Sequence, residues 1–346
     1  MANSNTSPSR LGQINASGGS WSNDNALFLK VFSGEILTTF EEQNVMKELH
    51  MVRTIQNGKS AQFPATGIAT AKYHTPGENI ADAGNNYLSA INHAERIIYI
   101  DDVLVSSTFI ANIDELKNHY DIRSIYAKEL GKALAKRFDI ATMKTLAGAA
   151  RSSATVNGGQ AGTSTNFDVA DTAAPTAAEL IDMLYLTAET LDIKDVSDEG
   201  RFAILKPKDY YTLITADSSA VSLASNRDAG GVGNIATGTI SQVAGIRLVK
   251  SNHLDDVAVA ANAQDAVDGT GTQNDPFGSG SGTYNGDLST TGILAGTREA
   301  IGTVKLLDLA TESEYQIERQ GTLFVAKYAM GHGVLRPECA VEIKLT

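Results

Sequence analysis

The chain has 346 residues, 42% of them hydrophobic, and a formal net charge of −12. A chain of this length and apolar content can bury one large core or two medium ones, so we expect a globular protein. The acidic balance argues against a nucleic-acid binder, because neutralising phosphates requires clustered Lys and Arg. A single cysteine cannot form an internal disulfide, and no run of 18 or more apolar residues occurs. We therefore expect neither an oxidising compartment nor a membrane span.

The N-terminal region is predicted to be an arm followed by a short helix. Its first 25 residues are polar and lack the apolar centre of a signal peptide, which favours a flexible arm. From about Ala26 to Leu49, apolar residues recur at mixed helical spacings around Gly34, which is typical of a short helix or a helix pair.

Residues 50–102 change character, since they are rich in β-branched and small residues and contain the turn signals NGK and TPGEN. We predict two or three extended strands joined by turns, one through Ile68 and Tyr73 and another that runs to Ile100. A hairpin of this kind has little core of its own and needs a neighbour to cover it.

A long amphipathic helix is predicted for about residues 114–151, where apolar residues recur at helical spacings. At 1.5 Å per residue it would be roughly 55 Å long and would act as a strut. Because its charges have mixed signs, a solvent face with ion pairs is favoured over a nucleic-acid patch. The residues assigned to that face are Lys117, Arg123, Lys128, Lys132, Lys136, Arg137 and Lys144, with Glu115, Asp121, Glu129 and Asp139.

The second half of the chain mixes helices and strands. After a linker at 152–174, Thr176 and Glu179 form the capping-box pattern of a second helix. A strand at Phe202–Leu205, a short helix after Pro207 and a strand from about residue 245 to 250 are predicted to follow.

The region from about 255 to 295 is predicted to be a flexible surface insertion, because it contains no Lys or Arg and few apolar anchors. Residues 301–346 are predicted to be strands interrupted by a polar helical piece. Helices and strands are segregated more than alternated, which favours the α+β class.

We expect no catalytic, cofactor or metal site. GKS at 58–60 lacks the first glycine of a phosphate-binding loop, the histidines have no zinc-site spacing, and GxSxG is absent. Gly331 and Gly333 flank His332, an arrangement that suits either a ligand cradle or a bent strand, and the bend is favoured. Cys339 is expected to be a buried small side chain rather than a reactive thiol.

Six long, collinear blocks of sequence carry a family resemblance. They are ALFLKVFSGEILTTF (Ala26–Phe40), HMVRTIQNGKSAQFPATG (His50–Gly67), YHTPGEN (Tyr73–Asn79), NHYDIRSIYAKELGKALA (Asn118–Ala135), GTVKLLDLA (Gly302–Ala310) and AKYAMGHGVLRPE (Ala326–Glu338). These blocks closely resemble the major capsid proteins of T-seven-like short-tailed bacteriophages (podoviruses).

The resemblance implies the Hong Kong 97 (HK97) capsid fold, of the α+β class. On this plan the chain divides into an N-terminal arm and helix (1–49), an extended E-loop hairpin (50–102), a P-domain (103–174) with its spine helix (114–151), an A-domain (175–300) with the flexible insertion at about 255–295, and return strands of the P-domain and A-domain (301–346).

The resemblance also implies a function in self-assembly. Hexamers and pentamers would form an icosahedral shell that encloses the double-stranded DNA of a tailed phage without binding it specifically. A scaffolding protein and a portal protein would be partners, and the chain would belong to the virion after assembly in the host bacterial cytoplasm. It would not be an enzyme. The alternatives are a nanocompartment shell of the same fold around an enzyme cargo, and an enzyme with a non-motif active site.

Within this plan we expect Arg53, Lys59, Phe63 and Pro64 of the E-loop to make contacts between subunits. Gly331 and Gly333 are expected to be hinges at which the last long strand of the P-domain turns toward the A-domain.

Overall fold

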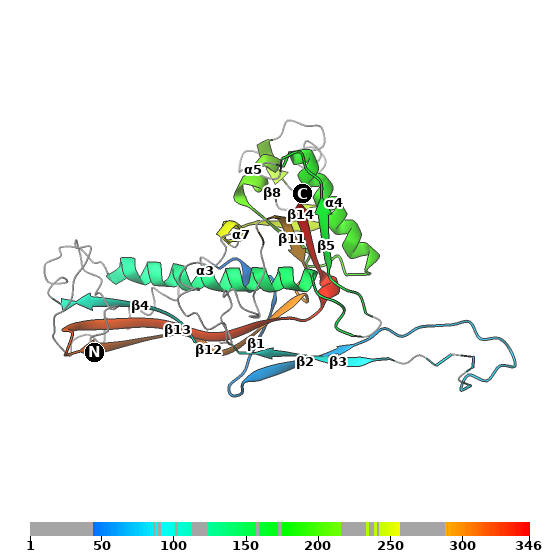
Figure 1. Cartoon of the computed structure of the whole chain (residues 1–346), viewed down its shortest axis with the longest axis horizontal. Helices are drawn as coiled ribbons and strands as arrows, with labels where there is room; N and C mark the ends of the chain where they lie inside the picture. The colour runs from blue at the N-terminus through cyan, green and yellow to red at the C-terminus, as the bar shows by residue number, and fades with distance from the viewer. Residues whose placement is uncertain are drawn as a thin grey trace.

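A long helix separates two β-sheets, and a thin hairpin projects from one end of the molecule in this computed structural model (Figure 1). The structure describes residues 44–82, 84–85, 87–88, 91–100, 103–112, 123–156, 159–171, 175–215, 233–234, 239–240, 242–256, 288 and 290–346. The arm, most of the predicted helix at 26–49, the start of the predicted long helix and most of the predicted insertion lie outside these residues.

The P-domain sheet has four strands in the order β1-β12-β13-β4. β12, β13 and β4 pair antiparallel, whereas β1 pairs parallel to β12. The strands are β1 (Met51–Thr54), β4 (Leu104–Ala111), β12 (Ile301–Gln316) and β13 (Gly321–Val334).

Helix α3 (Arg123–Ala150) runs along one face of this sheet (Figure 1). Leu130, Leu134 and Phe138 are buried at intervals of four residues and pack with Phe324 and Tyr328 of β13 in one core. The C-terminal half of α3 is buried on nearly every side and is rich in alanine, whose small side chain allows close packing. The predicted long helix is thus confirmed from residue 123, and its C-terminal end lies within one residue of the prediction.

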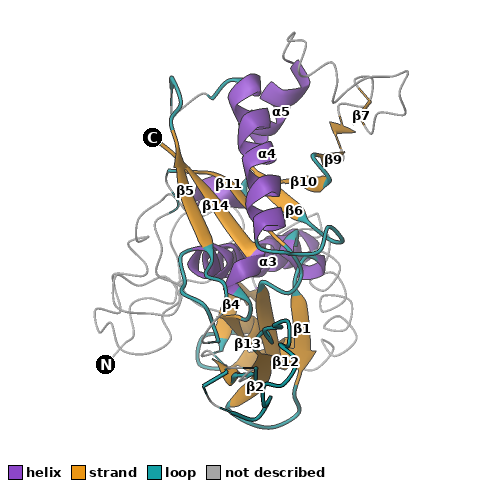
Figure 2. Cartoon of the chain, turned by 90° about the vertical axis from the view of Figure 1, so that its right-hand side faces the viewer, coloured by secondary structure: helices purple, strands orange, loops and turns teal. Residues whose placement is uncertain are grey.

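The A-domain sheet has six strands in the order β5-β14-β11-β6-β10-β9. They are β5 (Thr163–Phe167), β6 (Phe202–Leu205), β9 (Gln242–Val243), β10 (Ile246–Lys250), β11 (Thr291–Gly296) and β14 (Ala340–Leu345). β5 lies in the stretch predicted to be a linker of the P-domain, but it pairs parallel to β14 and so belongs to this sheet. α4 (Ala177–Ile193) and α5 (Pro207–Thr215) pack on it (Figure 2). The remaining elements are β7 (Gly233–Asn234), β8 (Thr239–Ile240) and α7 (His253–Asp256).

The central strands of this sheet are covered on both faces. In β6, Phe202 and Ile204 belong to the core shared with α3, whereas Ala203 and Leu205 belong to the core shared with α4. Successive side chains of a strand point to opposite faces, so this strand is apolar at every position. The capping box at the start of α4 is also confirmed, since Thr176 and Glu179 each bond the other's backbone N–H.

The projecting hairpin consists of β2 (Ser60–Thr66) and β3 (His93–Tyr99), which pair antiparallel. The predicted strand through Ile68 and Tyr73 is absent, because pairing ends at Thr66 with His93 and the described residues beyond have no regular secondary structure. The first strand of the region, β1, is not part of the hairpin, since it pairs with β12.

Two further predictions are wrong. β11 (Thr291–Gly296) lies in the predicted surface insertion but is fully buried between β14 and β6. Within β11, the absence of Lys and Arg is consistent with burial on both faces. The predicted polar helical piece in 301–346 is also absent. Instead β12 continues to Gln316, with Glu312 and Glu314 exposed at a period of two.

The α+β class is confirmed: the described residues form two large, mostly antiparallel or mixed sheets, two two-stranded sheets and a small number of helices. Among the described residues, no helix combines the length and apolar character that a membrane span requires.

Candidate functional site

The base of the β2–β3 hairpin is seated on the face of the P-domain sheet that α3 does not cover. Ala61 and Ile98 of the hairpin are buried against Val304 of β12 and Leu335, which follows β13. This small apolar seat holds one end of the hairpin and leaves the other end projecting (Figure 1).

Gly331 and Gly333 make this close seating possible. A Cβ atom on Gly331 would lie 1.9 Å from the backbone oxygen of Tyr99, and one on Gly333 would lie 2.6 Å from Cγ1 of Ile98. Both distances are far shorter than a van der Waals contact, so the hairpin rests directly on the backbone of β13. Only glycine allows such an approach here.

The predicted bend lies elsewhere in the chain. Gly331 and Gly333 sit inside β13, paired in register with Val304 and Gly302 of β12. The chain leaves the P-domain sheet after Val334 and enters the A-domain sheet at Ala340, through the short 3-10 helix η2 (Pro337–Cys339). In the structure, the two glycines allow the hairpin to contact β13, and the strand does not turn at them.

The four predicted contact residues lie at the seated end of the hairpin. Arg53 of β1 donates from Nη1 to the backbone carbonyl of Gln62 at 3.1 Å, and its guanidinium lies 5.6 Å from the centroid of the Phe63 ring. Phe63 is half-buried and packs on the seat, whereas Lys59 and Pro64 are exposed. The structure brings Arg53 and Phe63 together within one chain and leaves Lys59 and Pro64 open to solvent.

The hairpin tip, meaning the described residues between Thr66 and His93, displays a set of apolar side chains that sequence reasoning missed. Their exposed fractions range from 49% to 101% for Ile68, Tyr73, Ile80, Leu88 and Ile91. The pattern around Ile68 and Tyr73 predicted a strand, and it gave no signal that these side chains are exposed together with Ile80, Leu88 and Ile91. Their gathering in one projecting segment is evident only from the fold (Figure 1).

The tip is nevertheless organised by its own polar contacts. The hydroxyl of Tyr87 accepts a hydrogen bond from the backbone N–H of Thr75 at 3.0 Å and donates to the carboxylate of Glu78. His74 Nε2 donates to the backbone carbonyl of Glu78 at 2.9 Å, and its ring lies 5.3 Å from the ring of Tyr87. The apolar side chains therefore project from a shaped loop.

A second group of residues fixes the chain just before the hairpin. The 3-10 helix η1 (Met46–Glu48) is held by Asp139 of α3, which was predicted to face solvent but is fully buried. One carboxylate oxygen accepts from the backbone N–H of Val45 at 3.0 Å, and the other accepts from that of Met46 at 3.1 Å.

His50 and His332 form a buried chain through Thr303, with ring-nitrogen to hydroxyl distances of 2.7 and 2.8 Å. Burial lowers the pKa of His50 to about 4, against the opposing effects of the Met46 carbonyl and Asp139. Burial also lowers the pKa of His332 to about 3, and the proximity of His50 lowers it further.

Both rings are therefore neutral, and a single assignment of protons gives each of these hydrogen bonds one donor and one acceptor. His332 Nδ1 donates to Thr303, the Thr303 hydroxyl donates to His50 Nε2, and His50 Nδ1 donates to the Met46 carbonyl at 2.6 Å. Far from being a ligand, His332 ties β13 to β12 and to the root of the N-terminal segment.

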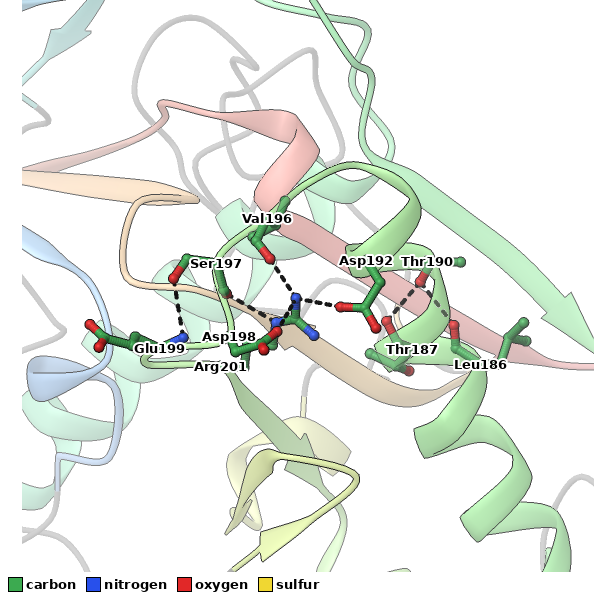
Figure 3. A network of polar contacts seen from close by, with 9 residues as sticks. All are labelled: Leu186, Thr187, Thr190, Asp192, Val196, Ser197, Asp198, Glu199 and Arg201. Carbon is green, nitrogen blue, oxygen red and sulfur yellow. Dashed lines mark hydrogen bonds and ion pairs between the residues drawn. The ribbon is translucent and has the colours of Figure 1, made fainter.

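In the A-domain, Arg201 holds the loop that follows α4 (Figure 3). Its buried guanidinium donates to the backbone carbonyls of Val196 and Ser197 and pairs with Asp192 at 2.7 Å and Asp198 at 2.8 Å. This network orders a surface loop.

Cys339 is buried, and burial raises the pKa of its thiol, which confirms the predicted small side chain in a packed position. No group of three His, Cys, Asp or Glu side chains in the described part of the chain is arranged to hold a metal ion.

A two-sheet body with a spine-like helix and a long projecting hairpin defines a shell-forming protein of the HK97-like capsid class. The sequence matches the family described as "Gp10A-like: Major capsid protein" over residues 62–344. The chain belongs to this family of phage major capsid proteins.

Relatives and solved structures agree with this assignment. The chain is 35% identical to the major capsid protein of Escherichia phage T7 over 91% of this chain and 90% of that one. It is also 35% identical to the major capsid protein of Enterobacteria phage T3, over 97% and 96% of the two chains. The capsid structure of cyanophage P-SCSP1u superposes with a TM-score of 0.71 at 38% identity, covering 99% of each chain.

These matches favour a capsid protein of a tailed phage of the T7-like podovirus group over a nanocompartment subunit. The chain is accordingly a virion component that assembles into an oligomeric shell.

Proposed function

We propose that this chain forms the hexamers and pentamers of an icosahedral shell around a double-stranded DNA genome, and that the hairpin joins neighbouring subunits. The family and its relatives support the capsid role. The hairpin supplies the physical means, because it reaches away from the body of its own subunit (Figure 1).

The observation that carries the proposal is the apolar tip. Tyr73 is 101% exposed and Leu88 is 66% exposed, on a loop whose shape is fixed by Tyr87 and Glu78. Fully burying one large apolar side chain contributes about 1.5–3 kcal/mol. Since the body of the same chain lies away from the tip, a neighbouring subunit is the natural cover. A head-to-tail contact of this kind forms a ring when the rotation between neighbours closes after a whole number of subunits, as in hexamers and pentamers.

Lys59 and Pro64 are part of the same proposal. Both are exposed beside the seat, where a neighbour's hairpin or body would pass. Arg53 is exposed as well, so it can meet a neighbour while it contacts Phe63.

We further propose that a scaffolding protein and a portal protein take part in assembly in the host bacterial cytoplasm, and that the chain has a structural rather than a catalytic role. DNA would be held by enclosure. The net charge of −12 suits a container whose wall does not adhere to DNA. Nuclease-protected DNA in purified particles supports this cargo, whereas protected protein cargo without DNA would contradict it.

The test of the hairpin contact replaces Tyr73 and Leu88 together by Asp. Because both side chains are exposed, the subunit should keep its melting temperature while shells disappear from electron micrographs. The matched control, Tyr73→Phe with Leu88→Met, keeps the apolar area and should assemble. Normal shells from the Asp variant would contradict the proposal.

A further inference from the structure

One buried carboxylate serves two distant parts of the chain. Asp139 of α3 is fully buried, and its two oxygens accept the backbone N–H groups of Val45 and Met46. The oxygen that accepts from Val45 also accepts from Nδ1 of His253 at 2.9 Å. Three donors from two separate segments therefore converge on one side chain of a third.

These donors lie next in sequence to two long segments of the chain. Val45 and Met46 come directly after residues 1–44, and His253 opens α7, which precedes residues 257–287. α7 lies beside α3 on the A-domain side (Figure 1), whereas η1 leads into β1 of the P-domain sheet.

The contacts to Asp139 depend on each other for a physical reason. A buried carboxylate carries a large desolvation cost that its donors offset together, and loss of one donor leaves the charge short of a partner. The carboxylate then gains from turning toward water, which pulls it away from the remaining donors. The side chain can move in this way because His253 is itself partly exposed, with 20% of its side chain open to solvent.

We propose that Asp139 is a shared anchor that couples the root of the N-terminal segment to α7 of the A-domain. Breaking the His253 contact loosens η1, although His253 does not touch it. Breaking the η1 contacts loosens α7 in turn, because coupling between two sites is reciprocal. This coupling is a property of the single subunit and does not rest on the proposed shell.

Amide hydrogen exchange of the full-length subunit tests the coupling, read on peptides that cover residues 44–50. His253→Ala should speed exchange of the Val45 and Met46 amides by about tenfold, as expected for loss of one charge-assisted hydrogen bond. His253→Asn, which keeps an N–H donor near the Nδ1 position, should restore slow exchange. The neighbouring exposed residue supplies the control, so Asn252→Ala should change nothing.

Asp139→Asn should speed exchange both at residues 44–50 and at α7. Peptides from α4 should stay protected in every variant, which separates loss of the anchor from general unfolding. The proposal is overturned if His253→Ala leaves residues 44–50 as slow as in the wild type, or if Asp139→Asn affects only one of the two segments.

Discussion

The core strands of the A-domain sheet and the tip of the hairpin are built from similar residues and behave in opposite ways. Ile204 and Leu294 are fully buried, whereas Ile68 and Leu88 are 70% and 66% exposed. The strands β6 and β11 pack against α3 on one face and against α4 on the other. At the hairpin tip, the described side chains of Ile68, Tyr73, Ile80 and Leu88 are each more than half exposed. The same apolar side chains thus stabilise the fold in one region and are available for association in the other.

The comparison shows that burial within the subunit, not composition, decides the role of an apolar residue. In the core, removing apolar area costs folding free energy. At the tip, it should cost only assembly. The following predictions test this difference, from the largest expected effect to the smallest.

The largest effect is expected from pH, at the buried histidine chain. The pKa values of His50 and His332 are lowered to about 4 and about 3, below the ordinary value near 6.5. The unfolded chain therefore binds more protons below pH 6.5. Stability is fully present above pH 6.5 and falls as the pH drops, by about 2 kcal/mol for each histidine at pH 5.

Urea unfolding of the subunit at pH 7 and pH 5 measures this loss. Replacing both histidines by Gln removes the titrating groups, so most of the difference between the two pH values should vanish even if the variant is less stable throughout. An equal difference in the variant would mean that other groups cause the acid sensitivity.

The second prediction compares a Leu-to-Ala substitution in the buried core with the same substitution at the exposed tip. Leu294→Ala should lower the free energy of unfolding by about 3 kcal/mol, since it removes a fully buried side chain from a core that is packed on both faces. Leu88→Ala should change it by less than about 0.5 kcal/mol, because the side chain is already exposed. Denaturation of the two unassembled variants measures both, and a large loss from Leu88→Ala would break the comparison.

A smaller effect is expected at the hairpin seat. Gly331→Ala forces a Cβ atom against the backbone of Tyr99 and should cost about 2 kcal/mol, mostly by lifting the hairpin from β13. Limited proteolysis at the hairpin base should become faster.

Gly148→Ala in α3 is the matched control for that change. Apart from the two chain neighbours and the backbone of the helix itself, no atom lies within 4 Å of the Cβ position at Gly148, and alanine favours helix. A gain of about 0.5–1 kcal/mol is expected there. If Gly331→Ala and Gly148→Ala changed the free energy of unfolding in the same direction, the close approach of Tyr99 would not explain why glycine is needed at position 331.

The sequence predicted correctly those elements whose formation depends on residues close together in the chain. The spacing of Leu130, Leu134 and Phe138 predicts α3, and Thr176 with Glu179 predicts the start of α4, because both signals lie within a few turns of the chain. The strand Thr291–Gly296 was missed because a strand buried on both faces lacks the alternation that marks a surface strand.

The functional features depended on contacts between distant residues, which no local pattern reveals. An acidic residue in a helix of mixed charges is predicted to face solvent. The partners of Asp139 that explain its burial, Val45 and His253, lie 94 and 114 residues away in sequence. Gly331 has the appearance of a hinge until the backbone of Tyr99 is placed against it. The pattern through Ile68 and Tyr73 predicted a strand, whereas in the fold both side chains are exposed on a loop without regular secondary structure.

The central claim is that the hairpin tip is covered by a neighbouring subunit, and amide hydrogen exchange compared between free subunits and purified shells tests it most directly. We predict that peptides from residues 67–92 become strongly protected in the shell, while β11, already buried in the subunit, exchanges at an unchanged slow rate. Tip peptides that exchange equally fast in free subunits and in intact shells would contradict the account.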